Sequence, residues 1–360
     1  MMLNFQNIST NTSTELNLDQ TPKELWDMAE KLIKEGHDPK AEIVYKKLLN
    51  NTNLAPLAYF RLGEIENRNK DIEKSSFYHT KAFKLDKKLT LRLVAPDHPN
   101  YYYQYDEVEE IEVKICPLCN GESELHSCFN MISNNAKLYG FNPIRKWRLC
   151  RKCNHIFAEN YPKNLEEIFS STGSKNYLKP NVGLFSILSS IISNINSVVS
   201  GNKLLEVGVG AGEMISVAKG MLYDVTGLDI RPVYAQNVSE RLGVPVYSID
   251  IMRFETDKLF DVIILGDVIE HLSKPTDLLI KCSKMLNEKG VIWISTPNFE
   301  SAFSNTMKDK DAMWRVWEHL NYFSYTSLNN VLNNLGFEVK DYKISQHYNG
   351  SMEVIAKRKS

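Results

Sequence analysis

Four of the six cysteines stand in two short pairs, Cys116-Pro-Leu-Cys119 and Cys150-Arg-Lys-Cys153, with 30 residues between the pairs. A turn with two intervening residues lets two thiolates bind one tetrahedral Zn²⁺, and two such turns supply all four ligands. Because no coordination position is then left for water, we expect the zinc to be structural. The gap exceeds the roughly 15–20 residues usual between such pairs, so the intervening hairpin must be long or carry an insertion.

Paired cysteines have two other uses, a redox disulfide and an iron–sulfur cluster, and the sequence alone leaves both open. His126 and His155 lie near the pairs, and we expect neither of them to be a ligand. Cys128 and Cys282 stand outside the pairs and are expected to be ordinary buried thiols.

The second chemically suggestive stretch is KLLEVGVGAGEMISVAKG, residues 203–220, in which an apolar strand leads through a glycine-rich turn into a helix. Gly208, Gly210 and Gly212 differ from the dinucleotide pattern GxGxxG, because the third glycine comes one residue early. Glu213 then stands where a phosphate would approach the helix N-terminus. A carboxylate there repels NAD but is harmless to a nucleoside ligand that carries no phosphate.

The segments LLEVGVGAG and VTGLDI together resemble motif I and the second-strand acid of class I S-adenosylmethionine-dependent methyltransferases. The resemblance covers about residues 180–358 and implies S-adenosylmethionine as the cofactor. It implies that Asp229 holds both ribose hydroxyls, that Asp250 accepts from the adenine amino group, and that Ile251 and Met252 flank the ring. The cofactor-binding residues implied in this way are Glu206, Gly208, Gly210, Gly212, Asp229, Ile230, Asp250, Ile251 and Asp267.

Two of these acids have less direct expected roles. Asp267, in FDVIILGDVIEHL, would face the methionine moiety of the cofactor. Glu206 would act mainly through a hydrogen-bond network behind the glycine turn.

Methyl transfer from a sulfonium is an in-line displacement, so a protein mainly positions the two reactants and excludes water. A base is needed when the acceptor is a hydroxyl or an acidic C–H group. His319 in WEHLNYFS, with Glu318 beside it, is the first candidate base, and His271 in IEHL is the second. Either histidine could instead be structural.

The acceptor is indicated only by resemblance. EHLNYFS, followed by Ser327-Leu and Gly336-Phe, looks like a subgroup common in bacterial glycan and antibiotic-sugar pathways, where this loop caps the acceptor pocket. CPLC…LCRKCNHIF is similar to the zinc-binding module of C-methyltransferases that act on nucleotide-activated deoxysugars. The implied acceptor is a small molecule or glycan precursor. Three aromatic residues of this loop have two equally plausible roles, which are to line the acceptor pocket or to pack the interior of the loop. They are Trp314, Trp317 and Tyr322.

Alternating short apolar strands and helices must position these residues, which predicts an α/β, Rossmann-like fold with a parallel sheet covered on both faces. Strands are expected at 203–207, 224–228, 245–249, 261–265 and 291–295. Helices are expected at 181–200, 211–220, 233–242, 276–286 and 327–335, followed by an antiparallel edge pair of strands.

The N-terminal segment has a helical pattern that repeats every 34 residues, so that Ala29 aligns with Gly63 and Tyr45 with His79. This period resembles the tetratricopeptide repeat. A plain pair of helical hairpins explains the pattern equally well. Two units seldom close a core alone, so we expect this segment to pack on another surface, and a protein partner is left open.

The predicted division of the chain is a disordered lead at 1–20, the helical segment at 21–92, a linker at 93–113 that enters a strand at 112–115, a zinc-ribbon-like module at 114–178 and a methyltransferase domain at 179–360. The formal net charge of −1 argues against a general nucleic-acid-binding surface. The sequence contains neither a signal peptide nor a long apolar span, which predicts no membrane partner and a cytoplasmic protein. A scaffold protein and a protein methyltransferase that uses the helical segment for docking are the alternatives to a small-molecule enzyme.

Overall fold

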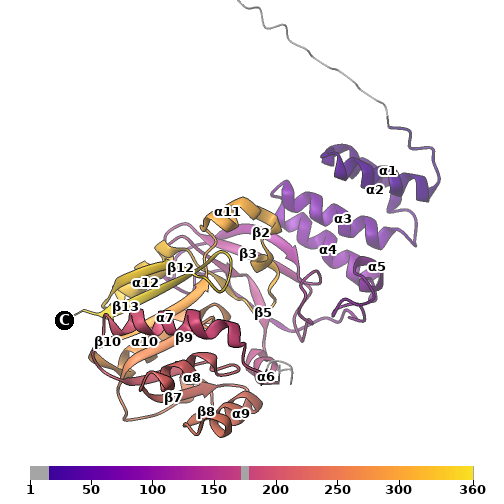
Figure 1. Ribbon diagram of the computed structural model, residues 1–360. Coiled ribbons are helices and arrows are strands. Elements are labelled where there is room, and N and C mark those ends of the chain that lie inside the picture. Colours follow the sequence, from indigo (N-terminus) through magenta and orange to yellow (C-terminus); the bar gives the residue numbers. More distant parts are fainter. Residues whose placement is uncertain (1–15, 172–177, 360) are drawn as a thin grey trace, which may run out of the picture. The chain divides into compact units, whose positions relative to one another are not determined.

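The computed structural model describes residues 16–171 and 178–359, which fall into two compact units, Met1–Leu89 and Thr90–Ser360 (Figure 1). Most of the expected disordered lead lies outside the described residues. Its last part packs on the first unit, because Leu16 and Leu18 are partly buried against the helices that follow. No described helix combines the length and the apolar character needed to cross a membrane.

The first unit consists of two helical hairpins. Its helices are α1 (Pro22–Lys34), α2 (Asp38–Leu48), α3 (Ala55–Arg68) and α4 (Ile72–Leu85). A Cβ atom at Gly63 would lie 2.6 Å from the His79 ring, and Ser75 Oγ donates to the Gly63 carbonyl at 2.7 Å. Helices α3 and α4 therefore approach closely at residues that the 34-residue period aligns with Ala29, Ala41 and Tyr45. The predicted helical organisation is present, and the repeat family itself stays a prediction.

The second unit begins earlier than expected, with a short helix α5 (Thr90–Leu93). The segment predicted to be a linker is folded into this unit. The Asn100 amide is buried and donates to the carbonyls of Ile132, Asn134 and Ala136, while its oxygen accepts from the Leu138 amide at 2.7 Å. The side chain thus fixes the long connection between the two cysteine pairs.

The cysteine-containing part forms two small sheets. One pairs β1 (Glu110–Glu112) with β5 (Asn160–Pro162), so the strand expected at 112–115 instead lies earlier in the chain and ends at Glu112. The other has the order β11-β4-β3-β2. Its strands are β2 (Glu124–Asn130), β3 (Ile144–Cys150), β4 (His155–Ala158) and β11 (Asn321–Tyr322).

The main sheet has seven strands in the order β12-β13-β10-β9-β6-β7-β8. Strands β8, β7, β6, β9 and β10 are parallel, whereas β13 pairs antiparallel with both β10 and β12. The strands are β6 (Lys203–Val207), β7 (Asp224–Asp229), β8 (Val246–Ser248), β9 (Phe260–Gly266), β10 (Leu286–Pro297), β12 (Phe337–Ile344) and β13 (Ser351–Arg358). The predicted α/β fold and antiparallel edge pair are confirmed, and β10 is longer than expected.

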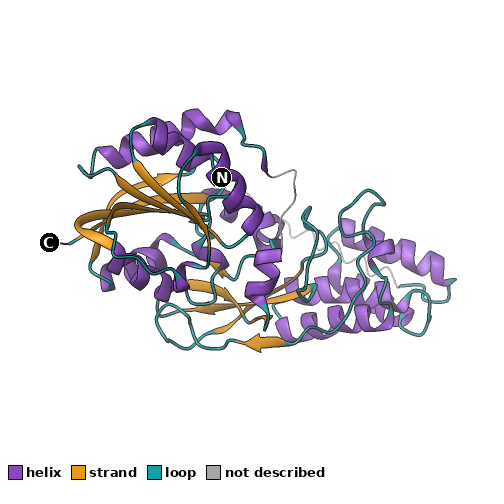
Figure 2. Cartoon of the chain, turned by 90° about the horizontal axis from the view of Figure 1, so that it is seen from below, coloured by secondary structure: helices purple, strands orange, loops and turns teal. Residues whose placement is uncertain are grey.

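Helices cover both faces of this sheet (Figure 2). Successive strand residues alternate between two hydrophobic clusters, as the side-chain period of two requires. Leu204 and Val262 pack with α7 (Phe185–Asn196), α8 (Glu213–Gly220) and α9 (Pro232–Leu242) on one face. Leu205 and Ile263 pack with α10 (Pro275–Met285) and α12 (Tyr325–Asn334) on the other. The remaining helices are α6 (Leu165–Ser171), α11 (Ala302–Met307) and the short 3₁₀ turns η2 (Val182–Leu184), η3 (Ile251–Arg253), η4 (Ile269–His271), η5 (Lys308–Lys310) and η6 (Ala312–Arg315).

Candidate active site

The glycine turn follows β6 beside β9, where the chain order along the sheet reverses. Carboxyl ends of parallel strands meet there, and open α/β sheets bind ligands at such a point. Gly208, Gly210 and Gly212 all have positive φ angles, of 75°, 52° and 85°. Among the described residues, nothing lies within 4 Å of a Cβ atom built on Gly210, whereas one on Gly212 would lie 2.9 Å from Val238. The turn is therefore packed at its end and open at Gly210, where its backbone can meet a ligand.

Asp229, at the end of β7, lies directly beside this turn. Its Oδ2 accepts from the Gly210 amide at 3.0 Å and from Arg231 Nη2 at 3.1 Å, and its Oδ1 accepts from Arg231 N and Nε, each at 2.9 Å. The structure thus brings together the acid and the glycine that the sequence singled out. It also adds Arg231, which sequence reasoning missed and which occupies both carboxylate oxygens.

Glu206 is buried behind the turn. Burial raises the pKa of its carboxyl well above the usual range, and the nearby carboxylates of Glu213 and Asp229 raise it further. Its Oε2 has no hydrogen-bond partner among the described residues. The surroundings of this side chain therefore disfavour its charged form.

The other predicted cofactor residues follow β8 and β9 at the same edge of the sheet. Asp250 caps η3 by accepting from the Met252 amide at 2.7 Å, and Ile251 is buried while Met252 is 44% exposed. Ile230 is half-buried after β7. Asp267 has a φ of 53° and accepts from Ser295 Oγ at 3.0 Å, and burial raises its pKa.

The two candidate bases, His271 and His319, lie side by side although 47 residues separate them in the sequence. Their ring centroids are 5.0 Å apart, and the Nε2 atom of each lies 4.0 Å from Glu270 Oε1. Glu270 is buried, and among the described residues this oxygen has no hydrogen-bond partner. Its other oxygen accepts from Thr296 Oγ1 at 3.0 Å. Sequence reasoning missed Glu270, although it stands next to His271 in the IEHL motif.

The protonation of this group follows from its surroundings. His271 Nδ1 lies 3.0 Å from the Glu318 carbonyl, which can only accept, so the proton of His271 is on Nδ1 and the lone pair on Nε2. Burial lowers the pKa of His319 well below its usual value, and the neighbouring His271 and Arg145 lower it further. Burial and the Asp267 carboxylate raise the pKa of Glu270. The lowered pKa of His319 therefore favours the neutral imidazole, which has a nitrogen that can accept a proton.

Glu318, which was expected to assist His319, contacts the group through its main-chain carbonyl to His271. Three aromatic side chains of the same segment are buried: Trp314 is 6% exposed, and Trp317 and Tyr322 are each 2% exposed. The Tyr322 hydroxyl donates to Asp311 at 2.5 Å. In this structure these side chains pack the loop, which is the second of the two roles that the sequence allowed.

The four paired cysteines converge on one point in the smaller sheet region. Cys116 Sγ lies 3.6 Å from Cys153 Sγ, Cys119 Sγ lies 3.5 Å from Cys150 Sγ, and all four sulfurs lie within 4.8 Å of one another. Thiolates around one tetrahedral zinc at ~2.3 Å would be roughly 3.7 Å apart. A disulfide needs about 2.05 Å, and all four cysteines are free thiols. The hydrogen bond to Cys153 lowers the pKa of Cys116 to about 6.

The neighbouring histidines have other partners, as expected. His126 stacks on Trp314 with centroids 5.5 Å apart, and His155 Nε2 lies 3.0 Å from Asn321 Oδ1. Cys128 and Cys282 are buried outside the four-sulfur group, which is also as expected.

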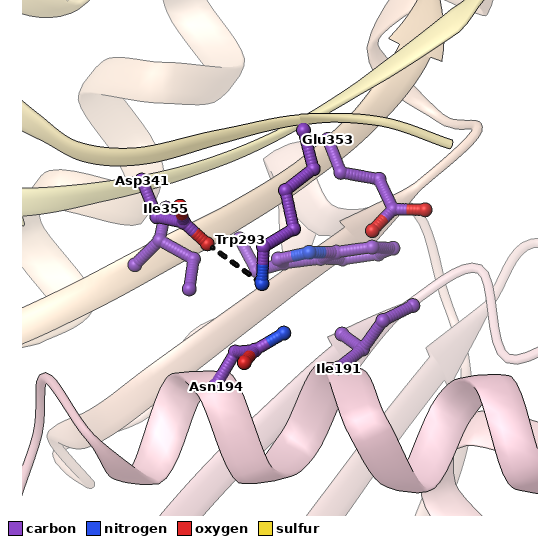
Figure 3. Close-up of a pocket in the computed structure, with 7 residues that line it drawn as sticks. Ile191, Asn194, Trp293, Asp341, Glu353 and Ile355 are labelled. Carbon is purple, nitrogen blue, oxygen red and sulfur yellow. Dashed lines mark ion pairs between the residues drawn. The ribbon is translucent and has the colours of Figure 1, made fainter. Parts of the chain in front are cut away.

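A small, shallow cavity lies between α7 and the strands β10, β12 and β13 (Figure 3). Asp341 and Lys343 form an ion pair at its rim, at 3.2 Å. None of its lining residues belongs to the predicted site, and they are Ile191, Asn194, Trp293, Asp341, Lys343, Glu353 and Ile355. The cavity therefore adds nothing to the glycine turn or to the histidine pair.

Part of the chain is similar in sequence to known proteins. Residues 185–342 match a family model described as a methyltransferase domain. A ubiquinone biosynthesis O-methyltransferase of Glaesserella parasuis serovar 5 is 31% identical over 110 residues, which cover 27% of this chain and 46% of that protein. One from Rickettsia bellii is 29% identical over 117 residues, covering 31% and 48%. The chain thus spans about half the length of the curated relatives it matches.

Among solved structures, the N-methyltransferase NodS from Bradyrhizobium japonicum WM9, in complex with S-adenosyl-L-homocysteine, aligns with a TM-score of 0.42 and 17% identity. The alignment covers 54% of this chain and 97% of that chain. Magnesium protoporphyrin IX methyltransferase from Synechocystis PCC 6803 aligns with a TM-score of 0.41 and 15% identity, over 54% and 93%.

Proposed function

We propose that this chain, which carries a class I S-adenosylmethionine-dependent methyltransferase domain over residues 185–342, transfers a methyl group from S-adenosylmethionine to a small-molecule acceptor. One observation carries the proposal. At the reversal point of the sheet, a turn of three left-handed glycines is open at Gly210 and hydrogen-bonded to the acid that ends the next strand. A nucleoside ligand without phosphate suits this turn, because Glu213 stands at the helix N-terminus where a phosphate would otherwise bind.

The residues present fit the cofactor. Asp229 supplies the two-oxygen acceptor that a ribose diol requires, and Arg231 must yield at least part of its hold on that carboxylate. Asp250 and its neighbours Ile251 and Met252 offer an acceptor and two apolar faces to the adenine. Asp267 and the open backbone at Gly210 would contact the methionine moiety of S-adenosylmethionine. When bound, S-adenosylmethionine supplies an electrophilic methyl group on sulfur.

The histidine pair supplies the base. When an acceptor hydroxyl or acidic C–H takes up the methyl group, an imidazole nitrogen of this pair would accept the acceptor's proton. His319 is the first candidate, because its lowered pKa keeps it neutral at working pH. His271 is the second, since its Nδ1 is committed to the Glu318 carbonyl and its Nε2 keeps the lone pair. Glu270, close to both Nε2 atoms, can share the proton that arrives.

The four cysteines would hold a structural zinc ion. Four thiolates close the tetrahedral shell, so the ion would stabilise the small sheet and take no part in methyl transfer. Thiolate ligands and six free cysteines suit a reducing compartment, which supports a cytoplasmic protein.

We infer a sugar or nucleotide-sugar acceptor, methylated on carbon or oxygen, from the likeness of the cysteine module and the EHLNYFS loop to glycan-pathway enzymes. The curated relatives are named for O-methylation in ubiquinone biosynthesis, which supports a small-molecule hydroxyl as the coarser acceptor class. The alternatives are a protein substrate docked on residues 21–92, whose helices would then act as a tetratricopeptide-like docking unit, and a non-catalytic scaffold.

Calorimetry tests the cofactor assignment. We expect S-adenosylmethionine and S-adenosylhomocysteine to bind and NAD not to bind. Asp229→Ala should weaken binding by ~1–3 kcal/mol, because the ribose hydroxyls lose their acceptor. The matched control is Asp224→Ala, at the opposite end of β7, where the side chain is 56% exposed and pairs with Lys258. Equal affinities in the two variants would remove Asp229 from the site, and tight NAD binding would overturn the function.

A further inference from the structure

The loop that carries His319 is built into the cysteine-containing sheet. After β10 the chain forms η5 and η6, reaches His319, and then adds β11 to the edge of β4, where Asn321 faces Phe157 and Tyr322 faces Ile156. The Ala158 amide donates to the Leu320 carbonyl at 2.8 Å. The strand pairing therefore fixes the backbone on the C-terminal side of His319.

On the other side of His319, the loop is held by two side chains from β3. Arg145 Nη1 donates to the His319 carbonyl at 2.5 Å, and Nη2 donates to the Trp317 carbonyl at 2.9 Å. The neighbouring Trp147 indole donates to the Trp314 carbonyl at 3.2 Å. Arg145 and Trp147, two positions apart on one strand, thus bind three carbonyls of a segment about 170 positions later.

Arg145 is only 2% exposed, which is unusual for an arginine. Its guanidinium lies 5.3 Å from the Phe141 ring centroid and 5.6 Å from that of Trp147. Glu110 provides some attraction, yet burial still lowers the pKa of Arg145 to about 10. Burying a charge costs free energy unless the charged group is hydrogen-bonded. The hydrogen bonds to the two carbonyls offset this cost for Arg145.

We propose that Arg145 is a positioning residue for the proposed methyl transfer: through the carbonyls of Trp317 and His319 it fixes the imidazole of His319 beside Glu270 and His271. The four-cysteine module is then one wall of the acceptor side of the site as well as a stable appendage. This inference rests on the proposed function for its catalytic meaning, while the geometry it describes can be tested without any substrate.

A planar guanidinium can donate to two carbonyls at once, whereas an ammonium group is a point donor. Arg145→Lys therefore keeps the positive charge and removes the two-pronged contact. Arg145→Lys leaves the positive charge near His319 in place. A change in the pKa of His319 in this variant would therefore report that water has reached the imidazole ring, because burial is the main cause of the lowered pKa. The titratable and charged groups facing that ring are Glu270, His271 and Arg145.

The test compares the full chain with Arg145→Lys and with the control Arg151→Lys, an exposed arginine of the same module that pairs with Glu124. Hydrogen exchange is followed at the His319 and Leu320 amides, which donate to Val316 and Glu270 carbonyls. We expect exchange there to accelerate about tenfold or more in Arg145→Lys and to stay unchanged in Arg151→Lys. In histidine-labelled protein, the His319 resonance, assigned with His319→Gln, should titrate closer to pH 6.5 in Arg145→Lys alone.

Unchanged exchange and an unchanged His319 titration in Arg145→Lys would overturn the proposal. Arg145→Met serves as a second variant, and metal content and S-adenosylmethionine calorimetry are measured on every variant. Exchange that accelerates throughout the small sheet, with loss of zinc, would assign Arg145 a purely structural role and also contradict the proposal. Failure of the unmodified chain to bind S-adenosylmethionine would remove the proposed function, while the exchange and titration results would still decide the geometry.

Discussion

The two sides of the candidate site are built in opposite ways. On the cofactor side, the residues lie at or just after the carboxyl ends of four parallel strands, β6 to β9, and all of them come from residues 206–267. On the acceptor side, His271 comes from η4, His319 from the loop after β10, and the side chains that hold that loop from β3. The first side is therefore fixed by local sequence, and the second by contacts between distant segments.

This difference predicts different responses to mutation. A change on the cofactor side should act at its own strand end and spare the rest of the unit. A change in the cysteine module should reach the acceptor side, because β11 and Arg145 join the two. Four experiments separate these behaviours, and they are described from the largest expected effect to the smallest.

Cys150→Ser should have the largest effect, since metal binding and local folding are coupled. We expect loss of the metal, of the β2–β3–β4 sheet, and of protection in the loop around His319. Metal analysis should find one zinc per chain in the unmodified protein, and near-ultraviolet circular dichroism follows the tryptophans. Cys128→Ala is the control, because this thiol is buried in the same sheet outside the four-sulfur group. A folded, zinc-free Cys150→Ser protein would contradict the structural role of the metal.

His319→Ala should lower turnover by ~10²–10⁴-fold, the usual scale for loss of a general base, and leave S-adenosylmethionine affinity intact. The measurement needs an acceptor that is turned over. His271→Ala is the companion variant: normal turnover in His319→Ala together with a defect in His271→Ala would move the base to His271. Normal turnover in both would mean an acceptor that is already nucleophilic.

Gly212→Ala tests how locally the cofactor side is fixed. The φ of 85° and the 2.9 Å approach to Val238 make a side chain unfavourable, and we expect a loss of ~1–3 kcal/mol in the free energy of unfolding, together with weaker cofactor binding. Gly220→Ala, at the other end of α8, has nothing within 4 Å among the described residues and should change stability by less than ~1 kcal/mol. Comparable losses in denaturant titrations of both variants would show that the turn is not the constraint.

The smallest effect concerns pH. The folded-state pKa of His319 is depressed by burial, so its contribution to stability is present above the unfolded value of ~6.5 and is lost as pH falls toward the folded pKa. The free energy of unfolding should decrease below pH ~6.5 with a slope of at most ~1.4 kcal/mol per pH unit from this group. His319→Gln should flatten that part of the curve, and the exposed His37→Gln should not. An identical acid limb in His319→Gln would show that other groups dominate.

Sequence reasoning found what local pattern encodes. The alternation of strands and helices, the left-handed glycines, the strand-end acids and the convergence of four cysteines all follow from short-range spacing. It missed what depends on long-range contact. Asn100 lies in a stretch that looked like a linker, and only the fold shows its amide holding the connection between the cysteine pairs. Arg145 carries no motif at all.

Glu270 and Arg231 are intermediate cases. Both adjoin residues that were predicted, so a search of the neighbours of His271 and Asp229 would have found them. Their roles depend on burial and on distances between side chains, which spacing does not give. The aromatic residues of the loop after β10 could not be assigned for the same reason, because packing and pocket-lining require the same residue types.

The two-residue strand Asn321–Tyr322 limits how this protein can be recombined. A module inserted before a catalytic domain can usually be exchanged for another at its two ends. Here an exchange would leave β4 with an unpaired edge and the loop after β10 without the carbonyl contacts of Arg145. A viable chimera must therefore transplant residues 298–324 together with the cysteine module, as a split cassette at two sites in the gene. The same constraint predicts that substitutions in the cysteine module and in residues 298–324 occur together during evolution.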